Sequence, residues 1–302
     1  MTYPYAYRLW HNFGKIKSSI ANVNANDALK DGAFGRLSAM KIGNTRVVLY
    51  KTELHPKQDG TGLPFVTVMQ QLISELGPKY VVTTGTAGAI GGQLECGDVV
   101  VCTGSRLHVQ KSYPKFPDID TDSKNETELA SPATTFDPQH VQYAATHFTR
   151  LAQPGLQQCY SRLQSRPGYT FVQAPSLPAS IYVTGVNPVP GPQPMDIVSA
   201  DYMTTDDNNN SEGLQNLGIM NDTDDAFLFY AISKMSAGTR PKCISVRNAS
   251  EPQMEHSPFP ATTTPTEIIN ILKDMAGTIY GIYQYCTTLN SAFACWGVIA
   301  GL

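Results

Sequence analysis

The stretch YVVTTGTAGAIGGQLECGDVVV, at Tyr80–Val101, decides the fold of this chain. Tyr80–Thr84 and Asp98–Thr103 are short runs rich in β-branched and other apolar residues, which is typical of strands buried on both faces. Between them, Gly85–Gly88 lets backbone amides and the Thr86 hydroxyl approach a bound anion or sugar without a Cβ in the way. The stretch predicts two buried strands around a glycine-rich turn that is either a binding site or a plain tight connection.

Strand and helix patterns alternate on both sides of this stretch, which indicates a mostly parallel sheet covered on both faces by helices. Arg46–Tyr50 is strand-like, and an amphipathic helix runs from Pro64 to Leu76. The other expected elements are strands at Ile181–Gly185, Ile197–Ser199 and Cys243–Val246, and helices at Asp222–Ala237 and Thr266–Ile299. The last helix has a predicted inner stripe of Ile268, Ile271, Leu272, Met275 and Ile279.

Two segments depart from this alternation. Residues 106–180 are rich in proline and polar residues, and they predict long loops and one helix near His140–Leu151, inserted over the site. The final ACWGVIAGL is apolar all round, so it packs either in its own core or on another subunit, and we expect a homo-oligomer. Residues 1–302 are otherwise expected to form one domain.

Composition narrows the class of partner. The chain has 302 residues, 41% of them apolar, which is enough for a substantial core. Its net charge of −3 gives no excess that would attract nucleic acid or an anionic membrane, so we expect a small-molecule partner. The first residues lack a signal-peptide pattern, and the apolar run Ser291–Leu302 is shorter than the roughly 20 residues of a spanning helix, so the expected location is cytoplasmic.

The six cysteines do not form a metal or disulfide pattern. They show no CxxC pair and no nearby histidine, so buried free thiols are the expected state. No metal and no cofactor is predicted.

Three later segments extend the first stretch into a longer pattern. They are IVSADYMTTDD at Ile197–Asp207, MNDTDDAFLFYAISKM at Met220–Met235 and SVRNASEP at Ser245–Pro252. Together with TTGTAGAIGGQLECGDVVV they resemble, in order, four motifs of the purine nucleoside phosphorylase and nucleosidase superfamily. TTGTAGAIGGQLECGDVVV is similar to the "TGTAG…GDVVV" core, and IVSADYMTTDD is similar to the strand end that places a base-stacking residue. MNDTDDAFLFYAISKM stands in the place of the "VEMEDAA" helix, and SVRNASEP in that of the "VRxISD" strand end. The resemblance covers about Met40–Val246 and beyond, and it implies a single-domain three-layer α/β/α sandwich with a mixed, mostly parallel central sheet.

The resemblance also implies cleavage of an N-ribosidic bond, for which Glu251 is the leading general acid. Ser250-Glu251 stands where the family has "SD", whose acid protonates or hydrogen-bonds the purine at N7. The alternative is an exposed loop glutamate before Pro252 with no role.

A second set of acids takes the place of the family's sugar-binding "EME". Here it is Asp222-Thr223-Asp224, in which each carboxylate is one carbon shorter. The resemblance implies that Asp224 holds a ribose hydroxyl, directly or through water. The alternative is that these acids only favour the start of a helix, where the macrodipole attracts negative charge.

The rest of the expected site is implied in the same way. Met203, or Tyr202 beside it, would lie against the base, with core packing as the alternative. Thr86 would orient a water molecule. The other expected substrate contacts are Thr84, Gly85, Ala87, Gly88, Arg247, Asn248 and Ser250.

The nucleophile is the open question of the sequence. Phosphorylases of the family resemble "RxGT", and the arginine position is Thr83 here, which favours water over phosphate. The family's "GDPxR" phosphate loop is not seen, so Arg8, Arg106 or Arg247 would have to bind phosphate if phosphate is used. The "GAMEEE" segment, which supplies a glutamate base in nucleosidases, is not seen either. Glu53 or His55 could replace that base, and His108 is another candidate at the edge of the pocket.

Three functions follow, in order of preference. The first is an N-ribosyl hydrolase acting on a purine nucleoside or a close analogue. The second is a phosphate-dependent nucleoside phosphorylase, and the third is a protein of this fold with a diverged, non-glycosidic role.

Overall fold

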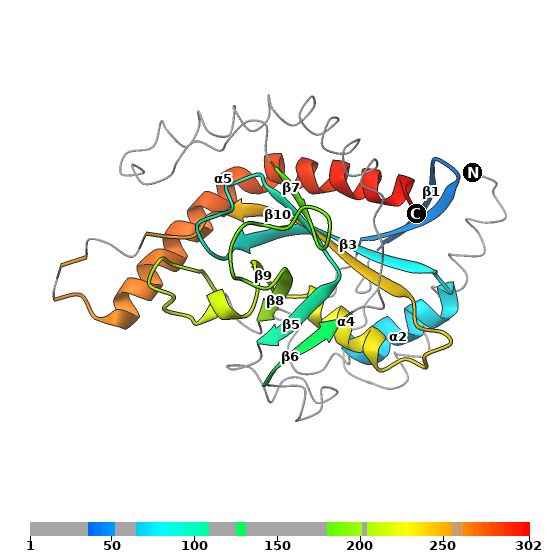
Figure 1. Cartoon of the computed structure of the whole chain (residues 1–302), viewed down its shortest axis with the longest axis horizontal. Helices are drawn as coiled ribbons and strands as arrows, with labels where there is room; N and C mark the ends of the chain where they lie inside the picture. The colour runs from blue at the N-terminus through cyan, green and yellow to red at the C-terminus, as the bar shows by residue number, and fades with distance from the viewer. Residues whose placement is uncertain are drawn as a thin grey trace.

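The computed structural model describes residues 36–51, 65–108, 125–130, 180–200, 204–255, 259–260 and 262–302. These residues form three layers around an eight-stranded sheet (Figure 1). In spatial order the strands are β6 (Asn125–Ala130), β5 (Gly104–His108), β8 (Asp196–Ala200), β9 (Met220–Asp222), β3 (Tyr80–Ala89), β10 (Lys242–Glu251), β4 (Val99–Cys102) and β7 (Ile181–Val183).

The sheet is mixed, as expected. β10 runs parallel to β3, and the pairs β4–β7, β5–β8 and β8–β9 are also parallel. The pairs β10–β4, β3–β9 and β5–β6 are antiparallel. The short strand β9 therefore runs back along the carboxyl end of β3, and this reversal forms the candidate site.

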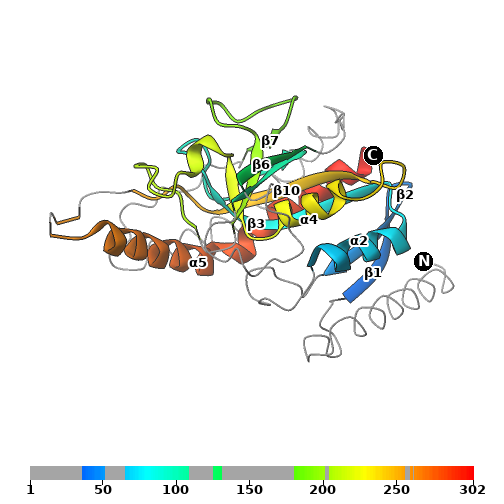
Figure 2. The same cartoon turned by 90° about the horizontal axis from the view of Figure 1, so that it is seen from below.

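Helices cover both faces of the sheet (Figures 1 and 2). α2 (Phe65–Leu76) and α4 (Asp225–Ser233) pack on one face, and the buried side chains there include Phe227 and Tyr230. α5 (Pro265–Ala300) packs on the other face against Ile244 and Val246 of β10. Successive side chains of a strand point to opposite faces, so the side chains of β10 pack alternately into the two hydrophobic cores.

The start of α5 has the sequence features of a helix N-terminus. Thr264 and Glu267 form a capping box, in which each side chain bonds the other's backbone N–H, and Pro265 occupies the first turn. Ile268, Leu272 and Ile279 are buried as predicted, and Met275 packs against the same cluster. Ile271 is 40% exposed, so its place in the predicted stripe is wrong; the contact line with the sheet instead passes through Ala276 and Tyr283.

The carboxyl end of α5 has both buried and exposed apolar residues. Ala294 and Val298 are buried in the chain's own core, whereas Trp296 is 53% exposed. None of the described helices is long and apolar enough to cross a membrane.

Two sequence expectations near the site are corrected. Gly85–Gly88 is not a turn but the second half of β3, and the chain turns only after Ala89. Tyr80–Thr84 is not buried on both faces: Thr84 is exposed, because β9 pairs only with Gly88 and Ala89, and the described residues supply no other partner strand for that edge of β3.

The predicted helix at 222–237 is also shorter than expected. Asp222 ends β9, which pairs with β3 and β8, and α4 occupies only Asp225–Ser233. The strand predicted at Arg46–Tyr50 lies within β2 (Thr45–Lys51), but β2 pairs with β1 (Arg36–Ile42) in a separate two-stranded sheet.

The segment 106–180 contributes the end of β5 and the whole of β6 to the main sheet, so these parts of it are strands and not loops. Most of the segment, including the helix predicted near His140–Leu151, lies outside the described residues. Among the cysteines, Cys96, Cys102 and Cys243 are buried free thiols as predicted. Burial raises the pKa of each of these three thiols well above its ordinary value.

Candidate active site

The site lies along the last five residues of β3, between β10 on one side and β9 on the other. Arg247 of β10 pairs with Gly85, and Glu251 pairs with Gly88. On the opposite edge Asn221 of β9 also pairs with Gly88. Segments more than 100 residues apart in the sequence are therefore brought together at this glycine-rich strand, as the motifs implied.

Glu251 is positioned by a β-bulge. The register between β10 and β3 shifts between Ala249 and Glu251, which sets Glu251 opposite Gly88. The side chain is only 8% exposed, so the alternative of an exposed loop glutamate is wrong. Burial raises the pKa of Glu251 to about 7, partly opposed by a hydrogen bond from the Ser250 hydroxyl.

A carboxyl group with a pKa near 7 has an acid form available at neutral pH. It can therefore give a proton to a leaving group, which an ordinary exposed glutamate at this pH does not do. Ser250 is itself held close to β3, since its Oγ lies 3.3 Å from the carbonyl oxygen of Ala87.

Gly88 is the point where side chains from the two flanking strands come close to each other. A Cβ at this position would lie 2.6 Å from Oδ1 of Asn221 and 3.4 Å from Oε1 of Glu251, so no larger residue fits there without displacing one of them. Asn221 was not among the predicted site residues. Its only signal in the sequence is its place directly before Asp222 in the motif MNDTDD.

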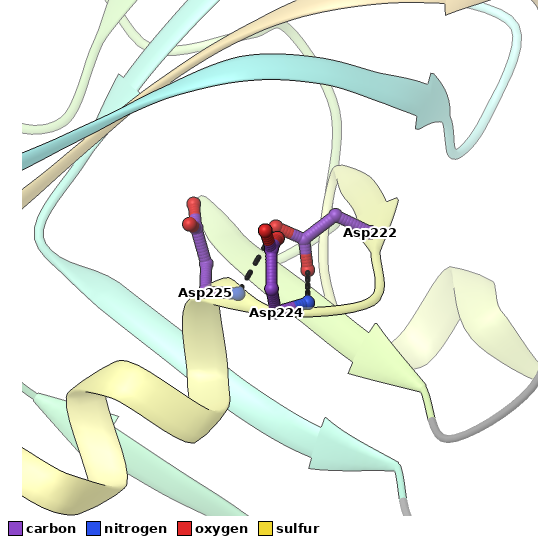
Figure 3. Close-up of side chains that lie close together, drawn as sticks. All are labelled: Asp222, Asp224 and Asp225. Carbon is purple, nitrogen blue, oxygen red and sulfur yellow. Dashed lines mark hydrogen bonds between the residues drawn. The ribbon is translucent and has the colours of Figure 1, made fainter. Parts of the chain in front are cut away.

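Three aspartates lie close together where β9 ends and α4 begins (Figure 3). We call Asp222, Asp224 and Asp225 the aspartate cluster. Arg247 reaches all three: its Nη2 lies 3.1 Å from Asp222 and 2.7 Å from Asp224, and its Nε donates to Asp225 at 2.8 Å. The guanidinium thus supplies the positive charge that a cation would otherwise bring to this cluster.

Gly85 makes this arrangement possible. A Cβ at Gly85 would lie 2.6 Å from Nη1 of Arg247, and the same Nη1 donates to the carbonyl oxygen of Thr86 at 3.2 Å. The glycines of the TTGTAG stretch therefore admit side chains from neighbouring strands.

Asp222 caps α4. Its carboxylate accepts hydrogen bonds from the backbone N–H groups of Asp224 and Asp225, at 3.4 and 3.2 Å, which are the dashed lines of Figure 3. Ser199 completes the cap, because its Oγ accepts from the Ala226 N–H at 2.7 Å. Asp224 precedes the helix but makes no side-chain capping bond, so the helix-start role belongs to Asp222.

The electrostatics of the cluster follow from its burial. Desolvation, and then the charge of Asp225, raise the pKa of Asp222 well above its ordinary value, although Arg247 opposes them. Burial would lower the pKa of Arg247, but the three carboxylates outweigh it and raise that pKa further above its ordinary value. The cluster therefore holds a permanent cation and at least one carboxyl group that is protonated more readily than usual.

The other predicted site residues lie at different distances from these contacts. Thr86 is partly buried beside Arg247, and Ala87 is buried beneath Ser250. Asn248 is buried and lies 2.8 Å from Ser291 of α5, so its polar contact points to the helix and away from the aspartate cluster. Five other residues that the sequence suggests lie outside the described part of the chain: Met203, Tyr202, Arg8, Glu53 and His55.

Thr84, Thr223, Arg106 and His108 stand apart from these contacts. Thr84 is exposed and Thr223 is partly buried. Arg106 lies on β5, 3.5 Å from Asp196, and the buried His108 ends the same strand. Two strands, β8 and β9, separate β5 from β3, so the structure does not bring Arg106 or His108 to Gly88.

Comparison with known proteins identifies a family for the chain. A family model described as the phosphorylase superfamily matches residues 11–168, more than half of the chain. No curated protein matches the chain.

Several solved structures are similar in fold. The 5'-methylthioadenosine/S-adenosylhomocysteine nucleosidase of Neisseria meningitidis is 15% identical, with a TM-score of 0.47 over 88% of this chain and 87% of that one. The corresponding nucleosidase of Colwellia psychrerythraea 34H is 14% identical, with a TM-score of 0.46 over 93% and 92%. The futalosine hydrolase of Helicobacter pylori is 13% identical, with a TM-score of 0.41 over 87% and 88%. At these values the likeness carries no conclusion about chemistry.

Proposed function

Because the chain belongs to the phosphorylase superfamily, we propose that it is an N-ribosyl hydrolase that cleaves the glycosidic bond of a purine nucleoside or a close analogue. It is an enzyme of the nucleosidase and nucleoside phosphorylase type. What is proposed beyond the family is the choice of water as nucleophile and the role of each residue.

The observation that carries the proposal is the buried carboxyl group of Glu251 at the end of β10. When the bond between the sugar and the base breaks, the electron pair stays with the base, and a proton on the base makes it a better leaving group. Glu251 has a pKa of about 7 and pairs with Gly88, whose missing Cβ leaves room for the Glu251 carboxyl group and the Asn221 amide above the β3 backbone. In its acid form it donates this proton to the base.

Asp224 is the proposed contact for the sugar. Its side chain is 31% exposed, the most accessible of the aspartate cluster, and Arg247 holds it at 2.7 Å. A carboxylate in a fixed position accepts a hydrogen bond from a sugar hydroxyl, and it stabilises positive charge that develops on the sugar as the base leaves. The helix is capped by Asp222 and not by Asp224.

Two features favour water over phosphate. Thr83 is neutral at the place where phosphorylases of the family have an arginine, and Arg247 is already ion-paired with three carboxylates, of which Asp222 and Asp225 are buried. Bringing a multiply charged anion into such surroundings without a free cation is costly. Thr86 is the proposed residue to orient the attacking water.

The test is a panel of purine nucleosides incubated with and without phosphate, with free base, ribose and ribose 1-phosphate measured separately. We expect release of base and free ribose at a rate independent of phosphate, and loss of this release in Glu251→Gln. A rate that rises and saturates with phosphate, giving ribose 1-phosphate, would contradict hydrolysis. Release of no base under either condition would contradict glycosidic chemistry altogether.

A further inference from the structure

Asn221, Gly88 and Glu251 form a row across three adjacent strands. Gly88 pairs with Asn221 of β9 on one edge of β3 and with Glu251 of β10 on the other. Because Gly88 has no side chain, the side chains of its two neighbours lean over it from opposite sides. Oδ1 of Asn221 and Oε1 of Glu251 lie 2.6 Å and 3.4 Å from the same point above Gly88, so they are at most about 6 Å apart.

The amide of Asn221 is fixed in one orientation. Its Nδ2 donates to the carbonyl oxygen of Thr204 at 3.2 Å and lies 2.6 Å from the Thr204 hydroxyl. A carbonyl oxygen can only accept, so the amide nitrogen must face Thr204, and Oδ1 must face Gly88. The orientation therefore follows from the chemistry of the neighbours.

This Oδ1 lacks a donor within the part of the chain that the structure describes, although Asn221 is only 7% exposed. A buried carbonyl oxygen without a hydrogen bond is unfavourable, and a ligand that brings an N–H or O–H group would remove that cost. The carboxyl group of Glu251 differs from the Asn221 carbonyl oxygen, because in its acid form it can donate a hydrogen bond. The row thus offers an acceptor on one side of Gly88 and an acid on the other.

This pair complements one class of purine. The edge of adenine that carries N7 presents an acceptor at N7 and a donor at the neighbouring 6-amino group, whereas guanine presents two acceptors, N7 and O6. Hypoxanthine shares O6 with guanine. A 6-oxo group would place its oxygen against Oδ1 of Asn221, leaving two acceptors facing each other.

We infer that Asn221 determines substrate specificity, accepting a hydrogen bond from the 6-amino group of the base while Glu251 meets N7, so that the substrates are 6-aminopurine nucleosides. The inference rests on the proposed function for the identity of the ligand as a purine nucleoside. It goes beyond it in assigning the 6-substituent and the residue that reads it.

The first experiment compares kcat/KM for adenosine and inosine, which differ at the 6-position, in the intact protein and in Asn221→Leu. We expect adenosine to be preferred by about 10- to 100-fold, as one base-reading pair of hydrogen bonds provides, and the preference to disappear in the variant. A preference that survives in Asn221→Leu, or equal kcat/KM values in the intact protein, would overturn the inference while leaving hydrolysis in place.

Asn290→Leu is the matched control. Asn290 is also a buried amide whose Nδ2 donates to a backbone carbonyl, that of Gly97 at 2.8 Å, and its Oδ1 lacks a donor among the described residues. The same chemical change at α5 should leave the ratio of the two kcat/KM values unaltered. A similar change of ratio in both variants would contradict a specific role for Asn221.

A second measurement does not depend on turnover. Calorimetric titration with free adenine and free hypoxanthine should show about 10-fold or more tighter binding of adenine, lost in Asn221→Leu. If no nucleoside is cleaved but this difference in binding is found, the proposed function fails and the assignment of Asn221 stands. If adenine and hypoxanthine bind equally well, the assignment fails whatever the turnover.

Discussion

The two acidic groups that flank β3 are both buried, but their surroundings differ. The aspartate cluster shares Arg247, two serine hydroxyls and the first N–H groups of α4. Glu251 has the hydroxyl of Ser250, and no cation pairs with it among the described residues. Arg247, which pairs with the aspartate cluster, and Glu251 both lie on β10 and pair with the same strand, β3.

The difference shows that the surroundings of a buried carboxyl group decide whether it is fixed in place or able to transfer a proton. Where a cation and several donors surround a carboxylate, its position is fixed and removing a partner leaves buried charge without compensation. Burial raises the pKa of both Asp222 and Glu251, but the oxygens of Asp222 are held by Arg247, Ser199 and the N–H groups of α4. Glu251 accepts a hydrogen bond from the Ser250 hydroxyl and has no cation beside it among the described residues, so its proton is available for transfer. We therefore assign a positioning role to most of the aspartate cluster and proton transfer to Glu251.

The largest expected effect is on the chemical step. Glu251→Gln keeps the shape and removes the proton donor, so kcat should fall by about 10²–10⁴-fold, measured as base release under saturating nucleoside. The unfolding transition should remain cooperative. Turnover equal to that of the intact protein would remove Glu251 from the mechanism and erase the distinction between the two groups.

The next effect is on stability. Arg247→Met removes the cation shared by three carboxylates, two of them buried, and it should lower the free energy of unfolding by about 3–5 kcal/mol in urea titrations. Arg240→Met is the control, because Arg240 donates to backbone carbonyls such as that of Met235 at 2.9 Å and contacts no carboxylate that we describe. Equal losses in the two variants would show that the cluster does not depend on its cation.

A third effect concerns the pH dependence of stability. Unfolding lowers the pKa of Glu251 from about 7 to its ordinary 4.5, so between these values the folded chain binds more protons than the unfolded chain. Its contribution to stability is therefore present below pH 4.5, and about 3 kcal/mol is lost as the pH rises to 7.

Comparison with Glu251→Gln isolates this contribution. Other buried acids titrate in the same range, among them Asp98, whose pKa burial raises to about 6, and they do so in both proteins. The difference in unfolding free energy between the two proteins should change with pH between 4.5 and 7. A constant difference would mean that Glu251 is not held in its acid form.

The smallest expected effect is at the accessible aspartate. Asp224→Ala should weaken binding of a nucleoside by about 1–3 kcal/mol more than binding of the free base, because one charged hydrogen bond to the sugar is lost. The measurement is calorimetric titration in the Glu251→Gln protein, so that the nucleoside is not cleaved. Equal weakening of both ligands would instead assign Asp224 to the structure of the cluster.

Much of the fold could be predicted from local patterns. The run Val99–Cys102 is a buried strand, as its β-branched residues indicated, and α5 begins at its capping box. The glycines of Gly85–Gly88 were misread as a turn, since their reason lies in Arg247 and Asn221, which approach from other strands. Such a reason is a tertiary contact and leaves no trace in the local sequence.

The site shows the same limit. The motifs predict roles for Glu251 and Asp224, but the burial of Glu251 depends on a bulge, and the capping role of Asp222 depends on where β9 ends. Asn221 was missed because an asparagine before acidic residues has no special pattern. Only its register opposite Gly88 sets it apart.

The bulge in β10 makes the position of the acid depend on strand register as well as on residue type. Side chains alternate between the two faces of a strand, so in a regular ladder Ser250 would pair with Gly88, and Glu251 would pair one residue further along and point to the opposite face. The contacts of Ile244 and Val246 with α5, further back along the strand, would be the same in either register. A chain with the same core and every acidic residue, but without the bulge, would thus turn its proposed proton donor away from the site.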